Sequence, residues 1–239
     1  MSTPVTRRDE IAAGLDDVRR RIADAAAAAG RSGDDVTLVV VTKFFPASDV
    51  RLLAELGVTD VGENRHPEAG DKLAECGAFG DLGLRWHFIG GLQSNKAAAV
   101  GSYADVVESV DRVKLVNALN RGAHERSHEI DVLLQVSLDP PGREGRAGAD
   151  ARELPALADA VDAAGMLRLR GLMAIAPLGE EPRAAFDRLA EVRASFVAER
   201  PDATWLSAGM SNDFEAAIGA GATHVRVGSA ILGARPEIK

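Results

Sequence analysis

The stretch Val36-Thr37-Leu38-Val39-Val40-Val41-Thr42-Lys43 is the strongest indicator of the fold. Its apolar, mostly β-branched residues do not alternate with polar ones, and such a run is typical of a parallel strand that is buried on both faces. Pro46 follows closely and limits the strand, because proline has no N–H to donate and restricts the residue before it. We therefore predict a buried strand over residues 36–42, with Lys43 at its carboxyl end.

The position of Lys43 suggests two different roles for its amine. At the end of a buried parallel strand the amine points into a partly dry pocket, where desolvation lowers an amine's pKa and lets it attack a carbonyl carbon. The alternative is an ordinary lysine whose stem packs while its ammonium group reaches water. Strongly perturbed lysines are uncommon, so the segment alone favours the ordinary role. The remaining motifs favour the nucleophile.

Strand-like and helix-like patterns alternate along nearly the whole chain, without a linker that would separate domains. We expect strands near 36–42, 58–61, 86–90, 105–108, 130–137, 167–172, 204–206 and 223–227. We expect helices near 7–29, 48–56, 67–76, 93–100, 111–121, 151–164, 183–199 and 212–219. Eight apolar strands with intervening helices predict an α/β protein, a single (β/α)₈ TIM barrel over residues 1–239, with the first helix as an extra element outside it. A doubly wound open sheet is the competing architecture.

Composition narrows the class of protein. The 239 residues are 46% hydrophobic, enough for a full core, and the single cysteine, Cys76, excludes an internal disulfide and fits a reducing compartment. The formal charge of −8 argues against a nucleic-acid partner. No apolar run reaches the roughly 20 residues that span a membrane, and the amino terminus lacks the apolar core of a signal peptide. We expect a cytoplasmic protein, a monomer or weak homodimer, because no long exposed apolar stripe stands out.

The loops after the seventh and eighth expected strands have the composition of anion-binding turns. Gly209 permits a tight backbone and Ser211 is a candidate helix N-cap, while Gly228 and Ser229 open a short helix. In TIM barrels, phosphate often binds at these two loops. Glycine and serine are ordinary turn residues, so neither loop is specific by itself. Their placement beside a strand-end lysine strengthens the prediction that both loops bind an anion.

Other strand ends also carry polar groups. Arg226 shares one face of its strand with His224, so a guanidinium near the top of the barrel needs either a ligand or a structural ion pair. His87 is a candidate proton donor or a hydrogen-bonded core residue. We find no metal-ligand spacing of His, Cys and carboxylate residues, and no Walker loop, Rossmann fingerprint or G-x-S-x-G motif.

Taken together, these motifs resemble those of the pyridoxal phosphate homeostasis proteins, whose barrel is similar to the amino-terminal barrel of alanine racemase. The matching segments are Val41-Thr42-Lys43, Gly62-Glu63-Asn64, Trp86-His87-Phe88-Ile89-Gly90, Leu92-Gln93-Ser94-Asn95-Lys96, Arg170-Gly171-Leu172-Met173-Ala174-Ile175, Ser207-Ala208-Gly209-Met210-Ser211-Asn212-Asp213 and Arg226-Val227-Gly228-Ser229-Ala230-Ile231-Leu232-Gly233-Ala234-Arg235. They follow the family's order and span nearly the whole chain.

The resemblance implies a fold-type III barrel that binds pyridoxal 5′-phosphate (PLP). It implies that Lys43 forms a Schiff base with the cofactor, that Arg226 meets the ring nitrogen, and that Asn64 and Met173 line the ring. The residues implied around the phosphate are Ser207, Met210, Ser211, Gly228 and Ser229. Four positions depart from the family's pattern: Arg65 replaces a common aromatic residue, Phe44-Phe45 replaces a more polar pair, and Ser137 stands where asparagine is expected.

We therefore favour a protein that binds PLP reversibly and buffers or delivers it, with little or no catalysis of its own. PLP-dependent apoenzymes are the expected recipients. Racemases and decarboxylases of this fold type add a carboxyl-terminal domain that brings a second acid or base to the cofactor. Only nine residues follow Ala230 in the sequence. The one tyrosine of the whole chain, Tyr103, precedes the fourth expected strand. The alternatives are a small PLP-dependent amino-acid racemase that uses Lys43 and His87 as bases, and a cofactor-free aldolase in which Lys43 attacks a sugar phosphate.

Overall fold

A computed structural model describes residues 5–77, 81–139 and 148–234. Within these ranges, parallel strands pair in chain order and close into a barrel, with the last strand bonded to the first. The strands are β1 (Thr37–Val41), β2 (Asp60–Glu63), β3 (Arg85–Phe88), β4 (Val106–Val110), β5 (Ile130–Gln135), β6 (Leu167–Met173), β7 (Trp205–Ser207) and β8 (His224–Val227). The predicted eight-stranded barrel is confirmed, and the open sheet is wrong because the ladder between β1 and β8 leaves no edge.

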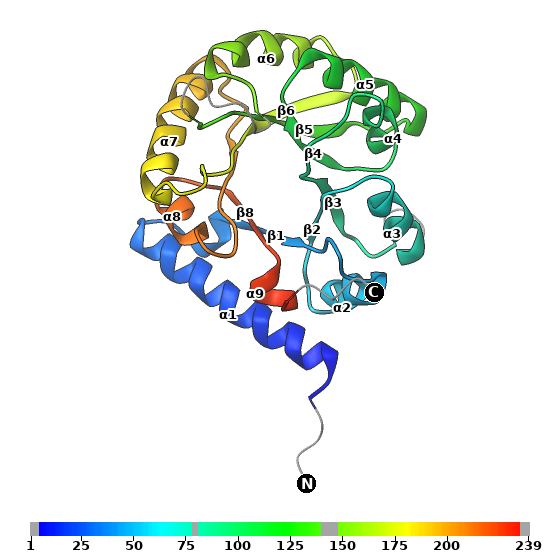
Figure 1. The fold of residues 1–239 in the computed structure, drawn as a ribbon, viewed down its shortest axis with the longest axis vertical. Helices are drawn as coiled ribbons and strands as arrows, with labels where there is room; N and C mark the ends of the chain where they lie inside the picture. Colours follow the sequence, from blue (N-terminus) through cyan, green and yellow to red (C-terminus); the bar gives the residue numbers. More distant parts are fainter. Residues whose placement is uncertain (1–4, 78–80, 140–147, 235–239) are drawn as a thin grey trace.

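The helices form a ring outside the strands (Figure 1). They are α1 (Arg7–Ala28), α2 (Ala47–Glu55), α3 (Glu68–Cys76), α4 (Ala97–Gly101), α5 (Val113–Arg126), α6 (Leu154–Asp162), α7 (Pro182–Glu199), α8 (Phe214–Gly219) and α9 (Ser229–Leu232), with 3₁₀ turns at Gly33–Asp35 and Ala151–Glu153. None of the helices in the described ranges is both long and apolar enough to cross a membrane.

The first helix packs against the outside of the barrel, as predicted. Thr6 and Asp9 form a capping box that satisfies free N–H groups at its start. Its buried stripe, which includes Ile11, Leu15 and Val18, lies against α8 and α9. The helix backbone comes so close that a Cβ on Gly14 would lie 2.7 Å from the Ile231 carbonyl oxygen. The helix α1 therefore fixes the position of α9, which follows the last strand (Figure 1).

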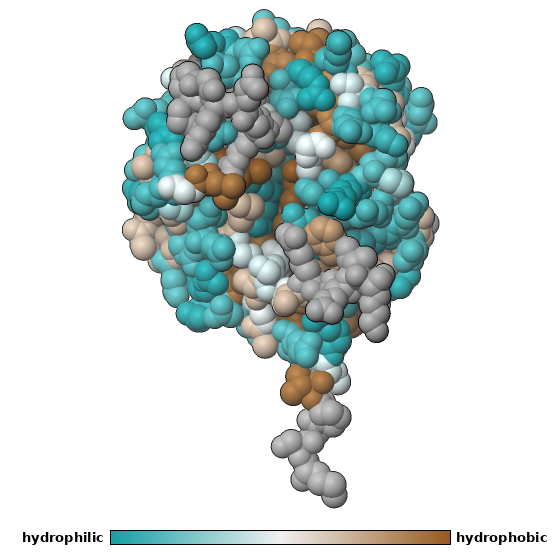
Figure 2. Space-filling model, in the orientation of Figure 1, coloured by the Kyte–Doolittle hydropathy of each residue, from teal (hydrophilic) through white to brown (hydrophobic). Residues whose placement is uncertain are grey.

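The core has two chemically different layers. Between the strands and the helices, apolar side chains form two large clusters, one around α4 to α7 and one around α1, α2 and β8. Inside the barrel, buried polar and charged side chains lie beside a small apolar cluster of Val106, Leu133 and Met173. Viewed along the barrel, the periphery is largely hydrophilic and hydrophobic residues gather toward the middle (Figure 2).

Several helix starts differ from the prediction by two residues or more, among them those of α4 and α8. The helix expected from residue 93 begins at Ala97, with Lys96 as its N-cap, because residues 94–96 form a turn. Ser211 is not an N-cap: a further turn separates it from α8, whose N-cap is Asp213. Ser211 consequently stays in the loop after β7, where its hydroxyl can face a ligand.

Candidate functional site

Lys43 lies at the carboxyl end of β1 and lines a cavity of about 450 Å³. The loops after β1, β7 and β8 meet in this cavity, so segments far apart in the sequence contribute to one wall. Five other predicted site residues line it as well: Met210, Ser211, Arg226, Gly228 and Ser229. The closed barrel brings them together, because the carboxyl ends of all its parallel strands lie at one end.

A tight turn presents Lys43 to the cavity. The Phe45 N–H donates a hydrogen bond to the Thr42 carbonyl (3.0 Å) and closes a loop around Lys43 and Phe44. Phe44 has a φ of 71°, a left-handed conformation that side chains with a Cβ rarely adopt. Phe45 is buried in the outer core, and this packing holds the turn in its strained form.

A buried ion pair braces the residue that precedes Lys43. The Lys72 ammonium donates to the Thr42 carbonyl (2.8 Å) and to a Glu63 carboxylate oxygen (2.5 Å). The Thr42 hydroxyl donates to the same Glu63 oxygen (2.6 Å). Thr42 is therefore held through both its backbone and its side chain, which fixes the position of the backbone just before Lys43.

The two late loops approach each other through their serines. The Ser229 hydroxyl lies 3.3 Å from the Ser211 hydroxyl. Gly228 and Ser229 are the N-cap and first residue of α9, so their backbone N–H groups lie at a helix start, where N–H groups lack intrahelical partners. The Met210 N–H, in contrast, donates to the Asp213 carboxylate (2.6 Å). Met210 can therefore contribute its side chain to the cavity, while its N–H is already bonded.

Arg226 lines the cavity and forms structural bonds, whereas its role toward a ligand stays a prediction. The whole residue is 4% exposed. Its guanidinium donates to the Ser207 hydroxyl (2.6 Å) and the Ala174 carbonyl (3.0 Å). The Ser207 hydroxyl in turn donates to Glu108 (2.6 Å). Ser207 was predicted beside the phosphate, but its hydroxyl is engaged by Arg226 and Glu108 inside the barrel, and Ser207 is not among the described residues that line the cavity.

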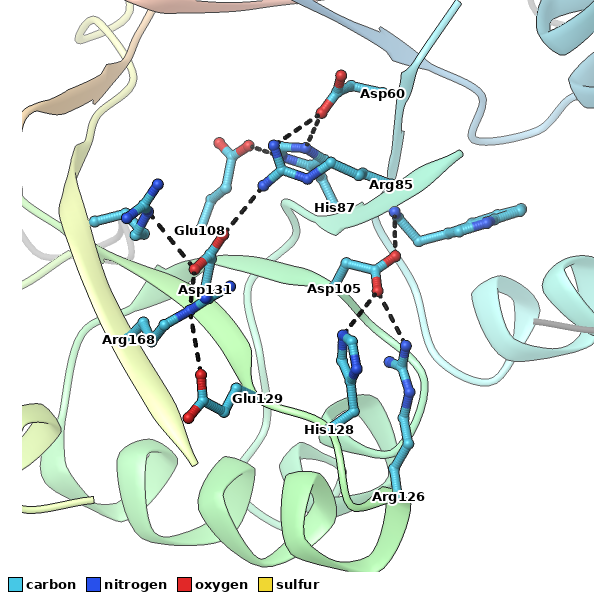
Figure 3. A network of polar contacts seen from close by, with 12 residues as sticks. Asp60, Arg85, His87, Asp105, Glu108, Arg126, His128, Glu129, Asp131 and Arg168 are labelled. Carbon is cyan, nitrogen blue, oxygen red and sulfur yellow. Dashed lines mark hydrogen bonds and ion pairs between the residues drawn. The ribbon is translucent and has the colours of Figure 1, made fainter. Parts of the chain in front are cut away.

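Behind Ser207 lies a fully buried histidine between two carboxylates (Figure 3). His87 Nδ1 lies 2.8 Å from Glu108 and Nε2 lies 2.9 Å from Asp60. An ionised carboxylate only accepts, so both ring nitrogens donate. Burial alone would lower the pKa of His87, but the two carboxylates outweigh it and raise that pKa. Burial opposes ionisation of Glu108, yet the hydrogen bond from His87 and the charges of His87 and Arg226 lower its pKa from 4.5 to about 2.

A second cavity of about 330 Å³ adjoins the first and shares Ile89 and Met210 with it. Asn64, a predicted site residue, lines this second cavity together with Gln135 and Ser137. Gly90 packs so closely on Asn64 that a Cβ there would lie 2.0 Å from the Asn64 carbonyl oxygen. Asn64 is consequently fixed from the side of β3.

Met173 ends β6 and is fully buried against Val106 and Leu133. It is not among the described residues that line either cavity, and its predicted contact with a ring remains a prediction. Sequence reasoning missed Glu108, which the structure places at the centre of the interior network. A carboxylate inside the apolar run Val106-Val107-Glu108-Ser109-Val110 was the signal that could have revealed it.

Two departures from the family's pattern contact each other in space. The Arg65 guanidinium lies over the Phe44 ring, 5.5 Å from its centroid. A cation over an aromatic face is attracted to the ring's negative face. The arginine at position 65 therefore has an aromatic partner, Phe44, in the turn that carries Lys43. In the described ranges, no group of three or more His, Cys, Asp or Glu side chains is placed to bind a metal ion.

Fold and site together define a class: a (β/α)₈ barrel with a lysine at the end of β1, loops that carry glycine and serine after β7 and β8, and a buried arginine on β8. Residues 14–236 match the family model for the alanine racemase N-terminal domain.

Curated and solved relatives give a narrower assignment. The pyridoxal phosphate homeostasis protein of Mycobacterium tuberculosis is 42% identical over 96% of this chain and 94% of its own. That of Escherichia coli is 39% identical over 97% and 99%, respectively. PipY of Synechococcus elongatus, solved with PLP bound, is 35% identical, with a TM-score of 0.79 over 93% of this chain and 100% of its own. The chain belongs to the family of pyridoxal phosphate homeostasis proteins.

The lowered pKa of Glu108 predicts a pH-dependent contribution to stability. Its ionised form stabilises the fold above its unfolded pKa, near 4.5, and this stabilisation is lost as the pH falls toward about 2. At pH 7, Glu108→Gln should reduce the free energy of unfolding by about 3–5 kcal/mol, because it leaves buried partners unpaired. Urea unfolding at neutral pH and at about pH 3.5 should show this deficit shrinking in acid. Glu129→Gln, on an exposed pair, is the control. An undiminished deficit in acid would contradict the assignment.

Adjacent glycines in the loop after β3 provide a second test. Gly90→Ala should destabilise the protein by about 1–3 kcal/mol, because its Cβ meets the Asn64 backbone and something must shift. Gly91→Ala should change stability little, since no atom lies within 4 Å of a Cβ at that position. Thermal unfolding of both variants measures the difference. Equal stability of the two would show that the close approach of Gly90 to Asn64 is absent.

Proposed function

We propose that this protein binds pyridoxal 5′-phosphate reversibly at Lys43 and holds it for delivery to other proteins. One observation carries the proposal: an amine, a buried guanidinium and two hydroxyl-bearing loops line the same cavity at the carboxyl end of the barrel. The names of the relatives support it, as does PipY, which was solved with PLP.

The residues present fit the chemical groups of this cofactor. Ser211 and Ser229, with the backbone at Gly228, offer donors to a phosphate where their two loops meet. Arg226 offers a guanidinium beneath the same cavity for the ring nitrogen. Asn64 borders the adjoining cavity, from which its amide can reach the edge of a ring. Met210 borders both cavities and supplies apolar contact.

Lys43 would form the covalent attachment. When bound, PLP supplies an aldehyde that condenses with the Lys43 amine, forming one C=N bond and releasing one water. Hydrolysis or exchange with another amine reverses this condensation, which suits a protein that must release its ligand. Arg226 remains a cation at any physiological pH, so it leaves a neighbouring ring nitrogen largely unprotonated. Such a ring withdraws electrons weakly, and carbanion chemistry is disfavoured.

The racemase alternative lacks support for its second base. His87 donates both ring protons to Asp60 and Glu108 and is not among the described residues that line either cavity. The chain's tyrosine, Tyr103, stacks on His66, and burial raises the pKa of its hydroxyl. We therefore favour storage and transfer over amino-acid turnover. The chemistry of transfer points to lysine-bearing apoenzymes that accept PLP as recipients.

Borohydride reduction followed by peptide mapping tests the attachment. Protein incubated with PLP should carry a pyridoxyl adduct on Lys43, because reduction makes the C=N bond permanent. Lys43→Ala should lose that adduct, and Lys114→Ala, which changes an exposed lysine of α5, should retain it. An adduct on Lys96 alone, or on surface lysines without preference, would contradict the proposed site.

Amino-acid turnover tests the distinction between a carrier and a racemase. The PLP-loaded protein should exchange the α-deuterium of a panel of amino acids slowly and without inversion, since neither His87 nor Tyr103 is among the described residues that line the two cavities. Exchange is measured by NMR and inversion by chiral chromatography, with unloaded protein as the background control. Rapid deuterium loss with inversion would favour the racemase.

A further inference from the structure

Arg226 is attached to a buried charge network that the proposed binding role does not by itself explain. The network runs through Ser207 to Glu108, then to His87 and Asp60. The side chains of His87, Glu108 and Arg226 are 0%, 1% and 3% exposed, so the network lies in a dry interior. Figure 3 shows its inner part, where His87 lies between Asp60 and Glu108.

The bonds of Arg226 determine the orientation of its guanidinium. Nη1 is held by Ser207 and Nη2 by Ala174, so both terminal nitrogens have fixed acceptors and the plane of the group cannot rotate freely. Glu108 lies 3.7 Å from Nη1, with the Ser207 hydroxyl bonded to both. A guanidinium has five N–H groups, so these two bonds leave donors available to a ligand in the cavity that Arg226 lines.

Glu108 is itself held in place from behind. His87 donates to one of its oxygens, and Asp60 fixes the far side of the imidazole. The charges alternate along the network: Asp60 is negative, His87 positive, Glu108 negative and Arg226 positive. In a dry interior such alternation stabilises each member, whereas removing one charge leaves its neighbour uncompensated.

Few other charged groups act on Arg226. Asp213, in the loop before α8, supports its positive charge. His224, on the same strand, is neutral because burial lowers its pKa to about 4. Glu108 is therefore the buried carboxylate nearest to the guanidinium among the described groups that influence it.

We propose that Glu108 is a positioning residue that acts through Ser207 to fix the orientation and charge balance of Arg226, and thereby the protonation of cofactor bound at Lys43. This inference rests on the proposed function. It assigns the barrel interior a role in setting the ligand's electronic state, beyond filling the core.

The test is a pH titration of the visible absorption band of protein loaded with PLP, together with its dissociation constant. Glu108→Gln should move the midpoint by about 0.5 pH unit or more, because a charge a few ångströms away shifts a pKa by about 1–3 units. It should also weaken PLP binding by about threefold or more. In an Arg226→Gln background the same Glu108→Gln change should move the midpoint by less than about 0.2 unit, since its route of action is gone.

Asp131→Asn is the matched control, because Asp131 is a buried carboxylate of the same barrel whose partners are Arg85, Arg168 and Arg170. Its midpoint should equal that of the unaltered protein. Circular dichroism identifies variants that keep the fold. Ser207→Ala is a second test variant, which breaks the connection between Glu108 and Arg226 without changing the formal charge. Its control is Ser109→Ala, since the Ser109 hydroxyl is buried without a hydrogen-bond partner in the described part of the chain. Ser207→Ala should shift the midpoint and Ser109→Ala should not.

Three results would overturn the proposal. One is a folded Glu108→Gln or Ser207→Ala protein with an unaltered midpoint and affinity. Another is an effect of Glu108→Gln that persists fully without Arg226. The third is a wild-type protein without a pyridoxyl adduct on Lys43, which would remove the proposed function and this inference together. In the first two results the Lys43 adduct is still formed, so the two kinds of failure are distinguishable.

Discussion

The pairing of charges inside the barrel is the constraint on which the site depends. Arg226 brings a permanent cation to the inner wall of the cavity, and an isolated cation in a dry interior is strongly unfavourable. Glu108 supplies the counter-charge, His87 balances Glu108, and Asp60 balances His87. The cost of burying this arginine is thus spread over three further strands. Because these bonds are shared, a change in any member leaves a neighbour uncompensated, so the interior is a polar network as well as a core.

The cavity wall is rigid on the side of Lys43 for a separate reason. Glu63 and Lys72 hold Thr42, and the strained turn at Phe44 is maintained by the burial of Phe45. On the neighbouring strand β8, which pairs with β1, α1 packs on α9 and fixes the loop that follows. The amine and the loops after β7 and β8 therefore belong to two braced parts of one barrel. A ligand that spans them meets groups already in place, which reduces the ordering cost of binding.

The repeating strand and helix pattern was sufficient to predict the barrel, because each buried parallel strand has its own apolar signature. That Lys43, Ser211, Arg226, Gly228 and Ser229 line one cavity could be predicted from the convergence of the carboxyl ends of barrel strands. Ser207 and Met173 show where this reasoning ends. Both stand at strand ends in matching segments, yet the side chain of one bonds inside the barrel and that of the other packs in a small core cluster. Period-two alternation predicts on which face of a strand a side chain lies, but not how deep inside the barrel it lies.

The sequence by itself determined the eight strands, their order and the residue types that gather at one end, because these follow from local patterns of apolar residues, glycine and proline. Only the tertiary structure decided which polar side chains meet. Closure of β8 on β1 and the staggering of the strands bring Arg226 to Glu108, 118 positions away in the chain, through Ser207. The pairing of β1 with β2 brings Arg65 over Phe44, so that two exchanges that look independent in the sequence form one contact. Such pairs depend on strand register and barrel curvature, which no local stretch of sequence encodes.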